Sequence, residues 1–334
     1  MNRRFTPTEP YDWRGAKTHA LITDIWYPAD PAAIEQMQWI GHEYAPFAKA
    51  GKAAPDAALI ATPKKFPLIL LSHGIGGSSS MMAWFGAALA SHGYIVAAVN
   101  HPGNNSLEDY TIPGAILWGQ RAGDLTAVLD QLLADPTFGP RIDSKRIGAA
   151  GFSLGGLTVL EIAGGVAEFS RFQDFCNSPK ADGMCNDTLE YPGLRAKATA
   201  LAQADTSFQA ALGESSKSHR DPRILAIFVM APAIGPAFSP DSLAKISIPT
   251  QIIAGSVDSV VPIETSAKFF AAKIPGAQLS ILQAVGHYTF LATCAELGNR
   301  TKPQLCIDQA GVLRDEIHAQ ATTLAYHFFD SNLK

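Results

Sequence analysis

The sequence predicts an α/β protein with a mostly parallel central sheet, helices on both faces and an inserted cap. Short apolar runs bounded by turn residues alternate with segments of helical periodicity, which is typical of strands joined by right-handed crossovers. The 334 residues suffice for one large core, since a chain of about 300 residues buries roughly 75% of its unfolded surface. A more polar, irregular stretch at residues 165–222 interrupts the alternation, so we expect a cap inserted into a single domain spanning residues 1–334.

The individual elements follow from apolar runs, periodicity and the residues that stop them. Strands are predicted at Leu21–Tyr27, Phe66–Ser72, Tyr94–Asn100, Arg146–Phe152, Ile224–Met230, Thr250–Ala254 and Ala277–Leu282. Helices are predicted at Met81–His92, Gln120–Ala134, Leu154–Ala163, Glu264–Lys273 and Val312–Phe329, with an alanine-rich helical piece around Ala196–Leu212. Residues 28–65 have weak periodicity, and we expect a long connection there with one helical turn around Ile34–Trp39.

Composition excludes several classes of protein. The chain has 26 Lys and Arg against 30 Asp and Glu, a formal net charge of −4, so no basic surplus points to nucleic acid. Hydrophobic residues make up 47% and charged residues 17%, which argues against a disordered chain. The most apolar stretch, Ile224–Phe238, is shorter than a membrane span of about 20 residues and contains two prolines. No apolar run follows Arg3 and Arg4, so we expect no signal peptide within this sequence.

The four cysteines fall into two local pairs, Cys176 with Cys185 and Cys294 with Cys306. Both pairs lie in segments rich in turn residues, and an even number at short separation indicates two disulfides. Two disulfides in turn predict a periplasmic or secreted protein. Four unpaired thiols in a cytoplasmic protein are the alternative. Neither pair has the C-x₂₋₄-C spacing of a zinc site, and we expect no metal.

A candidate nucleophile lies in the segment Gly151-Phe152-Ser153-Leu154-Gly155-Gly156, between a predicted strand and a predicted helix. A serine on a strained strand-to-helix turn needs small residues two positions to either side, because the backbone must turn sharply. The start of the helix also places partial positive charge beside Ser153. The alternative interpretation is a glycine-rich turn with a capping serine.

A second motif, Ser72-His73-Gly74-Ile75-Gly76-Gly77, follows the strand Phe66–Ser72. In serine hydrolases with this turn, one oxyanion donor is the amide after the nucleophile, and the other comes from a glycine-rich loop after an earlier strand. The backbone N–H groups of Leu154 and Ile75 occupy those positions. We interpret His73 as structural, since a histidine this early in the chain does not suit the general base.

The serine needs a base, and the base needs an acid to orient it, in the chain order serine, acid, histidine. Asp258 follows the strand Thr250–Ala254, and His287 follows the strand Ala277–Leu282. Both are therefore expected at the carboxyl edge of the sheet, beside Ser153. Asp258 is alternatively a turn residue. Asp241 is the next candidate for the acid, and Asp205 is the third.

These features together resemble the α/β-hydrolase family from about Leu21 to Phe329, and the α/β-hydrolase fold is the fold that this resemblance implies. More narrowly, the chain resembles the bacterial predicted dienelactone hydrolases, which are related to the platelet-activating-factor acetylhydrolases. The matching segments are Trp26-Tyr27-Pro28, Leu71-Ser72-His73-Gly74, Asn100-His101-Pro102-Gly103, Arg121–Leu133 and Gly151–Gly156. True dienelactone hydrolases carry a cysteine nucleophile where this chain has Ser153, so their name does not give the substrate. The acetylhydrolase branch implies small or oxidised acyl esters.

The sequence therefore predicts a serine carboxylic-ester hydrolase without cofactor, with Ser153, His287 and Asp258 as catalytic triad and a small-molecule ester as substrate. Trp84, Phe85 and Trp118 are candidates for the acyl pocket, and ordinary core positions are their alternative. A lactonase, amidase or acyltransferase would use the same triad. A non-catalytic binding protein on this fold is the alternative from another class.

Overall fold

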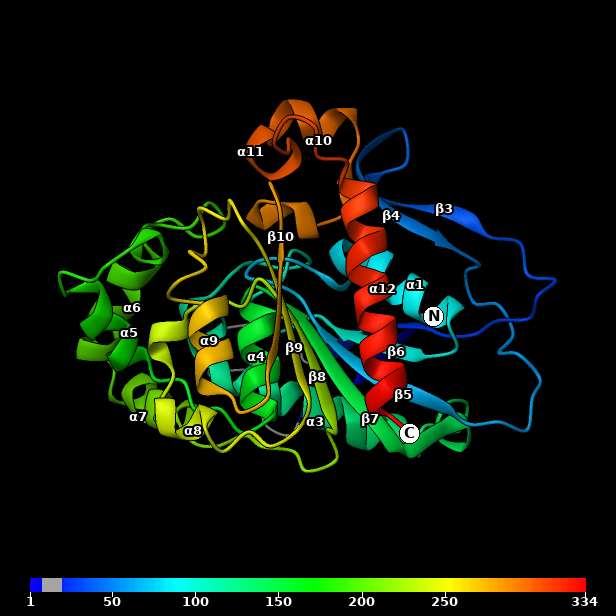
Figure 1. Cartoon of the computed structure of the whole chain (residues 1–334), viewed down its shortest axis with the longest axis horizontal. Helices are drawn as coiled ribbons and strands as arrows, with labels where there is room; N and C mark the ends of the chain where they lie inside the picture. The colour runs from blue at the N-terminus through cyan, green and yellow to red at the C-terminus, as the bar shows by residue number, and fades with distance from the viewer. Residues whose placement is uncertain (8–19) are drawn as a thin grey trace.

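The central sheet follows the predicted α/β pattern (Figure 1). Within residues 1–7 and 20–334, which the computed structural model describes, eight strands pair in the order β1-β2-β6-β5-β7-β8-β9-β10. All neighbours from β6 to β10 are parallel, whereas β1 and β2 are antiparallel at one edge. The strands are β1 (Asn2–Phe5), β2 (Leu21–Trp26), β5 (Phe66–Ser72), β6 (Ile95–Val99), β7 (Ile142–Phe152), β8 (Ala226–Met230), β9 (Thr250–Gly255) and β10 (Gln278–Leu282). The predicted fold class is confirmed.

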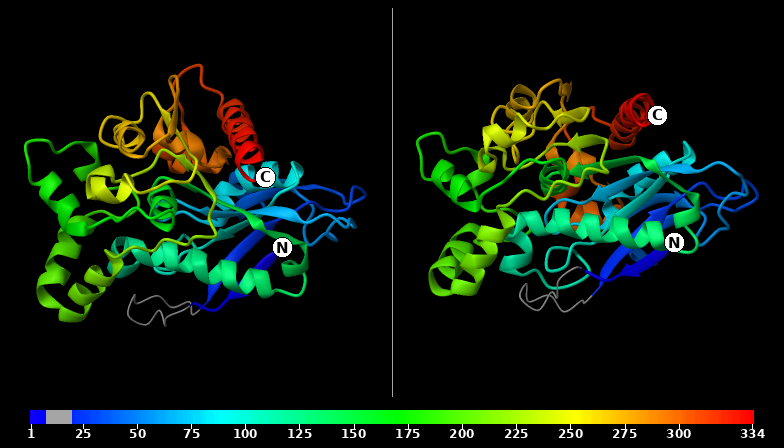
Figure 2. Two further views of the ribbon diagram at one scale, coloured as in Figure 1. Left: turned by 60° about the horizontal axis from the view of Figure 1, so that its bottom comes forward. Right: turned by 90° about the horizontal axis from the view of Figure 1, so that it is seen from below.

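Helices cover both faces of this sheet (Figure 2). Helices α1 (Ala83–Ser91) and α12 (Arg314–Asn332) pack on one face, and α3 (Trp118–Ala134), α4 (Leu154–Ile162) and α9 (Ala267–Lys273) pack on the other. Successive residues of β5 alternate between the two cores: Leu68 and Leu70 face α3 and α4, while Ile69 and Leu71 face α1 and α12. A strand buried on both faces is continuously apolar, and the run Phe66–Ser72 has this pattern.

Shorter helices connect these layers. They are α2 (Ile112–Ile116), α8 (Pro240–Leu243), α10 (Glu296–Thr301) and α11 (Pro303–Cys306), with 3₁₀ turns η2 (Ser79–Met82), η3 (Gly139–Arg141), η5 (Gly235–Ala237) and η6 (His287–Phe290). In the described part of the chain, no helix is both long enough and apolar enough to cross a membrane.

Residues 165–222 contribute helices α5 (Phe169–Cys176), α6 (Leu194–Ala204) and α7 (Thr206–Ser215) and the turn η4 (Gly183–Cys185), gathered at one end of the molecule (Figure 1). The helical piece expected around Ala196–Leu212 is divided at Asp205. Its carboxylate accepts hydrogen bonds from Ser207 N (2.8 Å) and Phe208 N (3.1 Å) and so begins α7 as an N-cap. The division into one domain with an inserted cap stays a prediction.

The structure corrects the expectation for residues 28–65. Instead of a helical turn around Ile34–Trp39, this segment forms the hairpin β3 (Gln36–His42) and β4 (Ala45–Ala53), and β4 also pairs with β11 (Thr293–Cys294). The hairpin is mostly exposed, so it lacks the apolar alternation that marks a half-buried strand. Its second partner is more than two hundred residues away in sequence, which a local pattern does not reveal.

Both predicted cysteine pairs form disulfides. Cys176 at the end of α5 bonds to Cys185, with Cα atoms 5.4 Å apart. Cys294 in β11 bonds to Cys306 in α11, with Cα atoms 5.5 Å apart. The first disulfide closes a short loop within the segment 165–222. The second joins α11 to β11, the strand that extends the β3–β4 hairpin.

Candidate active site

The three predicted triad residues meet at the carboxyl edge of the sheet. Ser153 follows β7, Asp258 follows β9, and His287 begins η6 after β10. His287 Nε2 lies 3.0 Å from Ser153 Oγ, and His287 Nδ1 lies 2.7 Å from Asp258 Oδ2. All three residues are buried, with 5–7% of each exposed. The result is one continuous hydrogen-bonded chain from hydroxyl to carboxylate.

The direction of this chain follows from the chemistry of its ends. An ionised carboxylate only accepts hydrogen bonds, so His287 Nδ1 carries the proton and donates to Asp258. The lone pair of Nε2 then accepts the Ser153 hydroxyl. The other oxygen of Asp258 accepts from Val260 N (3.0 Å) and Val261 N (2.7 Å), which fixes the carboxylate.

The two competing acids lie elsewhere. Asp241 is in the first turn of α8, and Asp205 caps α7. Asp258 is thus the carboxylate that reaches His287.

The turn that presents Ser153 requires glycine on both sides. Ser153 has φ 55° and ψ −116°, a strained conformation for a residue with a side chain. A Cβ atom on Gly151 would lie 2.0 Å from the carbonyl oxygen of Gly155. A Cβ atom on Gly155 would lie 2.0 Å from the carbonyl oxygen of Ser72. Gly155 therefore lets the end of β5 lie directly beside the start of α4.

The two predicted oxyanion donors line the same pocket as Ser153. Leu154 is the first residue of α4, so its N–H has no partner within the helix. Among the described residues no hydrogen bond engages Ile75 N–H, although the loop around it is held firmly. His73 Nδ1 donates to Gly74 O (2.7 Å), and Gly76 bonds through its N–H to Asn104 (2.8 Å) and through its carbonyl to Tyr110 (2.7 Å).

The pocket at Ser153 has a volume of about 110 Å³ and a mainly apolar wall. Trp118 is part of that wall, with the rings of Phe169 and Phe172 6.1 and 6.2 Å from its own. Helix α5, which carries both phenylalanines, belongs to the segment 165–222. The candidate cap thus supplies one side of the pocket.

The structure corrects the expectation for the other two candidate pocket aromatics. Trp84 stacks on His318, with ring centroids 3.9 Å apart, and its indole N–H donates to Phe290 O. Phe85 is fully buried against Phe228 in the core beneath α1 and α12. Both lie on α1, whose apolar side covers the sheet, so the alternative of ordinary core positions holds for them.

Six polar residues of the pocket wall were not predicted from the sequence: Asn186, Asp187, Thr188, Glu190, Arg195 and Tyr288. Burial, together with the nearby charge of Glu190, raises the pKa of the Tyr288 hydroxyl well above its ordinary value. Glu190 and Arg195 belong to the segment 165–222, and only its folding over the sheet edge brings them to Ser153. Tyr288 directly follows His287 in the sequence, and this adjacency is the one signal that could have placed it in the pocket. Among the described residues, no cluster of three or more His, Cys, Asp or Glu is placed to hold a metal ion.

Comparison with known proteins supports the same class of fold. A ferulic acid esterase from Streptomyces cinnamoneus has a TM-score of 0.62 over 100% of this chain and 88% of its own, at 19% identity. With the mostly parallel sheet and the strand-to-helix turn at Ser153, the chain has the α/β-hydrolase fold.

A narrower similarity covers the early strands and the loop of Ile75. Residues 23–115 match the family model described as platelet-activating factor acetylhydrolase, isoform II. Lipase 1 of Moraxella sp. (strain TA144) is 42% identical over 80 residues, 24% of this chain and 22% of the lipase. Cutinase est1 of Thermobifida alba is 36% identical over 97 residues, 28% of this chain and 29% of the cutinase.

The platelet-activating factor acetylhydrolase of Cavia porcellus is 47% identical over 49 residues, 15% of this chain and 11% of the acetylhydrolase. The chain thus spans less than a third of the length of each of these relatives. Over this part of its length, the chain resembles the platelet-activating-factor acetylhydrolase group.

Proposed function

We propose that this protein is a serine carboxylic-ester hydrolase that works through an acyl-enzyme on small to medium acyl esters. The observation that carries the proposal is the unbroken chain Ser153–His287–Asp258 at the wall of an apolar pocket. Similarity to a lipase, a cutinase and acetylhydrolases supports the ester bond as the target. Ser153 acts as nucleophile, His287 as general base and Asp258 as the acid that orients it.

The first half-reaction forms the acyl-enzyme. Ser153 Oγ attacks the ester carbonyl carbon while its proton passes to His287 Nε2. The carbonyl oxygen becomes an oxyanion that accepts hydrogen bonds from the N–H groups of Ile75 and Leu154. One such donor typically contributes about 3 kcal/mol in the transition state. His287 then returns the proton to the leaving alkoxide oxygen as the bond between carbon and that oxygen breaks.

The second half-reaction regenerates the serine. Water gives a proton to His287 Nε2 and attacks the acyl carbon, and the oxyanion forms again between the same two N–H groups. Collapse of this intermediate breaks the bond between the acyl carbon and Ser153 Oγ, and His287 returns the proton to that oxygen. Asp258 holds the imidazole in the tautomer that both half-reactions need.

The size of the pocket favours short acyl groups. Its volume of about 110 Å³ is below the ~300–1,000 Å³ of typical pockets for drug-sized ligands. The apolar wall around Trp118 suits an alkyl or small aryl chain better than a charged one. The same triad serves a lactonase, an amidase or an acyltransferase, and a substrate panel separates these activities.

The two disulfides support an oxidising compartment, the periplasm or the outside of the cell. They stand against the alternative of a cytoplasmic protein, in which thiols are kept reduced. The expected partner is a small-molecule ester.

Covalent labelling tests the proposal directly. A fluorophosphonate should add to Ser153 in the wild-type protein, and the Ser153→Ala variant should give no adduct by peptide mass spectrometry. Wild-type protein should also release p-nitrophenol from p-nitrophenyl acetate faster than from longer esters. An unlabelled Ser153, or labelling that Ser153→Ala leaves unchanged, would exclude the enzyme and favour a binding protein. Parallel assays with lactones and anilides identify the preferred bond.

A further inference from the structure

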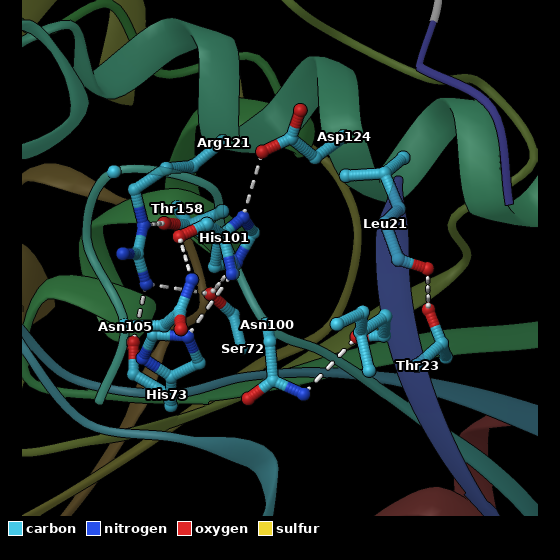
Figure 3. Close-up of polar contacts among 12 residues, drawn as sticks. Leu21, Thr23, Ser72, His73, Asn100, His101, Asn105, Arg121, Asp124 and Thr158 are labelled. Carbon is cyan, nitrogen blue, oxygen red and sulfur yellow. Dashed lines mark hydrogen bonds and ion pairs between the residues drawn. The ribbon is translucent and has the colours of Figure 1, made fainter. Parts of the chain in front are cut away.

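A second, fully buried group of polar side chains comprises Ser72, His101, Asp124 and Arg121 (Figure 3). Ser72 Oγ lies 2.9 Å from His101 Nε2, and His101 Nδ1 lies 2.9 Å from Asp124 Oδ2. Ser72 ends β5, His101 follows β6, and Asp124 lies in α3. None of the three is more than 3% exposed. The proposed mechanism uses none of them.

Arg121 lies one turn before Asp124 on α3. It connects this group to the two segments that carry the N–H groups of Ile75 and Leu154. Its Nη2 donates to Ser72 Oγ (3.1 Å) and to the carbonyl of His73, two residues before Ile75. Its Nε donates to Thr158 Oγ1 (2.9 Å). Thr158 in turn donates to the carbonyl of Leu154 (3.0 Å). A single guanidinium, 1% exposed, thus holds the β5 loop and the first turn of α4.

The hydrogen bonds of this group run in one direction. The Asp124 carboxylate accepts, so His101 Nδ1 carries a proton and Nε2 accepts the Ser72 hydroxyl. Ser72 Oγ meanwhile accepts from Arg121. The dipoles therefore align from the guanidinium of Arg121, through Ser72 and His101, to the carboxylate of Asp124.

His73 completes the arrangement as a neutral ring. Burial, and then the positive charge of Arg121, keep its pKa well below the ordinary value. Its Nδ1 donates to Gly74 O, and its Nε2 accepts the backbone N–H of His101 (3.2 Å). The residues just before Ile75 are thus tied to the residues just after β6.

We propose that Arg121 is a positioning residue that sets the geometry between the N–H groups of Ile75 and Leu154, and that Ser72, His101 and Asp124 hold its guanidinium in place. This inference rests on the proposed function, because it concerns the oxyanion of that reaction. Three of the acceptors of Arg121 lie on the two segments that carry these donors. Donors preorganised for the oxyanion lower the barrier only while their separation is kept.

The sharpest test is a matched pair of variants at Thr158, which links Arg121 to α4. Thr158→Val keeps the shape but loses the hydroxyl, whereas Thr158→Ser keeps the hydroxyl. We expect Thr158→Val to lower kcat for p-nitrophenyl acetate about tenfold, and Arg121→Lys to lower it about 10²-fold, as for loss of one oxyanion donor. KM should change less than about twofold in each. Thr158→Ser should retain nearly full activity.

A second measurement separates positioning from general stability. A trifluoromethyl ketone forms a tetrahedral adduct with Ser153, so its inhibition constant should rise by the factor by which kcat falls. The control is Arg223→Lys, which replaces a guanidinium that pairs with Asp221 (2.6 Å) and with Asp130 of α3 (2.6 Å), away from the loop. This control should leave the inhibition constant unchanged. Thermal unfolding of each variant verifies that it is folded.

The outcomes are distinct. If Thr158→Val and Arg121→Lys are folded and bind the ketone like the wild type, the positioning role is overturned while the esterase stands. The same holds if Thr158→Ser loses as much activity as Thr158→Val. Should Arg121→Lys not fold, the Thr158 pair still decides. A wild-type protein without ester hydrolysis and without an adduct at Ser153 would overturn the proposed function first, and this inference with it.

Discussion

Two Ser–His–Asp arrangements adjoin the loop that follows β5, and their hydrogen-bond distances are nearly alike. In Ser153–His287–Asp258, the imidazole nitrogens of the histidine lie 3.0 Å from the serine oxygen and 2.7 Å from the carboxylate oxygen. In the other, Ser72–His101–Asp124, both distances are 2.9 Å. In each, one imidazole joins a hydroxyl to a carboxylate, and all six residues are buried. The hydrogen-bond geometry alone therefore does not distinguish a catalytic triad from a structural one.

The surroundings of the two serines differ. Ser153 lies at a strained turn, lines a pocket and points its hydroxyl at His287. Ser72 is the last residue of β5, is fully buried, and its oxygen accepts a hydrogen bond from Arg121. A positive donor on that oxygen withdraws the electron pair that an attack needs, and no substrate reaches it. Access and the neighbouring charge, more than residue type, assign the chemistry.

Replacing each serine by alanine gives the largest contrast. Loss of the nucleophile in a triad typically costs about 10⁶-fold in kcat, and we expect that order for Ser153→Ala. Ser72→Ala removes a positioning contact, so a loss of about tenfold is expected, below the effect of a whole oxyanion donor. Initial rates with p-nitrophenyl acetate measure both. A fluorophosphonate adduct on Ser72 in the Ser153→Ala protein would reverse the assignment.

The aspartates that end the two hydrogen-bonded arrangements, Asp258 and Asp124, test the same contrast. Asp258→Asn leaves the wrong histidine tautomer beside Ser153, and about 10⁴-fold loss in kcat is expected. Asp124→Asn affects only the support of the loop, so we expect kcat to fall about tenfold while KM stays unchanged. The control is Asp241→Asn on α8, which should keep full activity. Full activity for Asp258→Asn and a loss for Asp241→Asn would identify Asp241 as the acid.

The first arrangement was predictable from sequence because each member follows a buried apolar strand. Parallel strands bring their carboxyl ends to one edge, so Ser153, Asp258 and His287 were expected to meet there. The second was not predicted, although Ser72 and His101 each follow such a strand. Asp124 and Arg121 lie within a helix, where charged residues usually indicate a solvated face, and only the packing of α3 against β5 and α4 buries them.

The same reasoning explains where the fold could and could not be predicted. The core strands β5 and β6 are continuously apolar, and their bounds were right to within one residue. The strand β7 begins at Ile142, four residues before the predicted start, because the residues that follow Ile142 are polar and partly exposed. The β3–β4 hairpin is exposed and pairs with β11 from the far end of the chain, so no local pattern marked it. Trp84 and Phe85 were ambiguous because an aromatic on a helix suits a pocket wall and a core equally.

A buried histidine outside both arrangements tests whether burial alone keeps an imidazole neutral. His318 donates to Thr289 O from Nε2 and stacks on Trp84, and burial lowers its pKa from 6.5 to about 4. The charge of Arg314 lowers the pKa further, whereas Asp315 raises it. The unfolded chain therefore binds the proton more tightly, so stability present above pH 6.5 is lost as the pH falls toward 4.

The expected loss at pH 4 relative to pH 7 is about 3 kcal/mol in the free energy of unfolding from this one group. Urea unfolding at several pH values measures it. His318→Gln should flatten the decline, while His327→Gln, on the exposed side of the same helix, should leave it unchanged. An equally steep decline in His318→Gln would assign the acid sensitivity to other groups.

The smallest expected effect concerns the wall of the pocket that Ser153 lines. Ser72 lines no part of this pocket. Cys185 lines the pocket and is tied by its disulfide to Cys176 at the end of α5, which also carries Phe169 and Phe172. Replacing both cysteines by serine should lower the free energy of unfolding by about 2 kcal/mol, as for closure of a short loop. Because the pocket wall loosens with it, KM should rise severalfold while kcat stays within twofold.

The Cys294–Cys306 pair, which joins β11 to α11, is the matched control: its replacement should cost similar stability without changing KM. Equal KM changes from both pairs would show that the wall around Cys185 does not bind the acyl group.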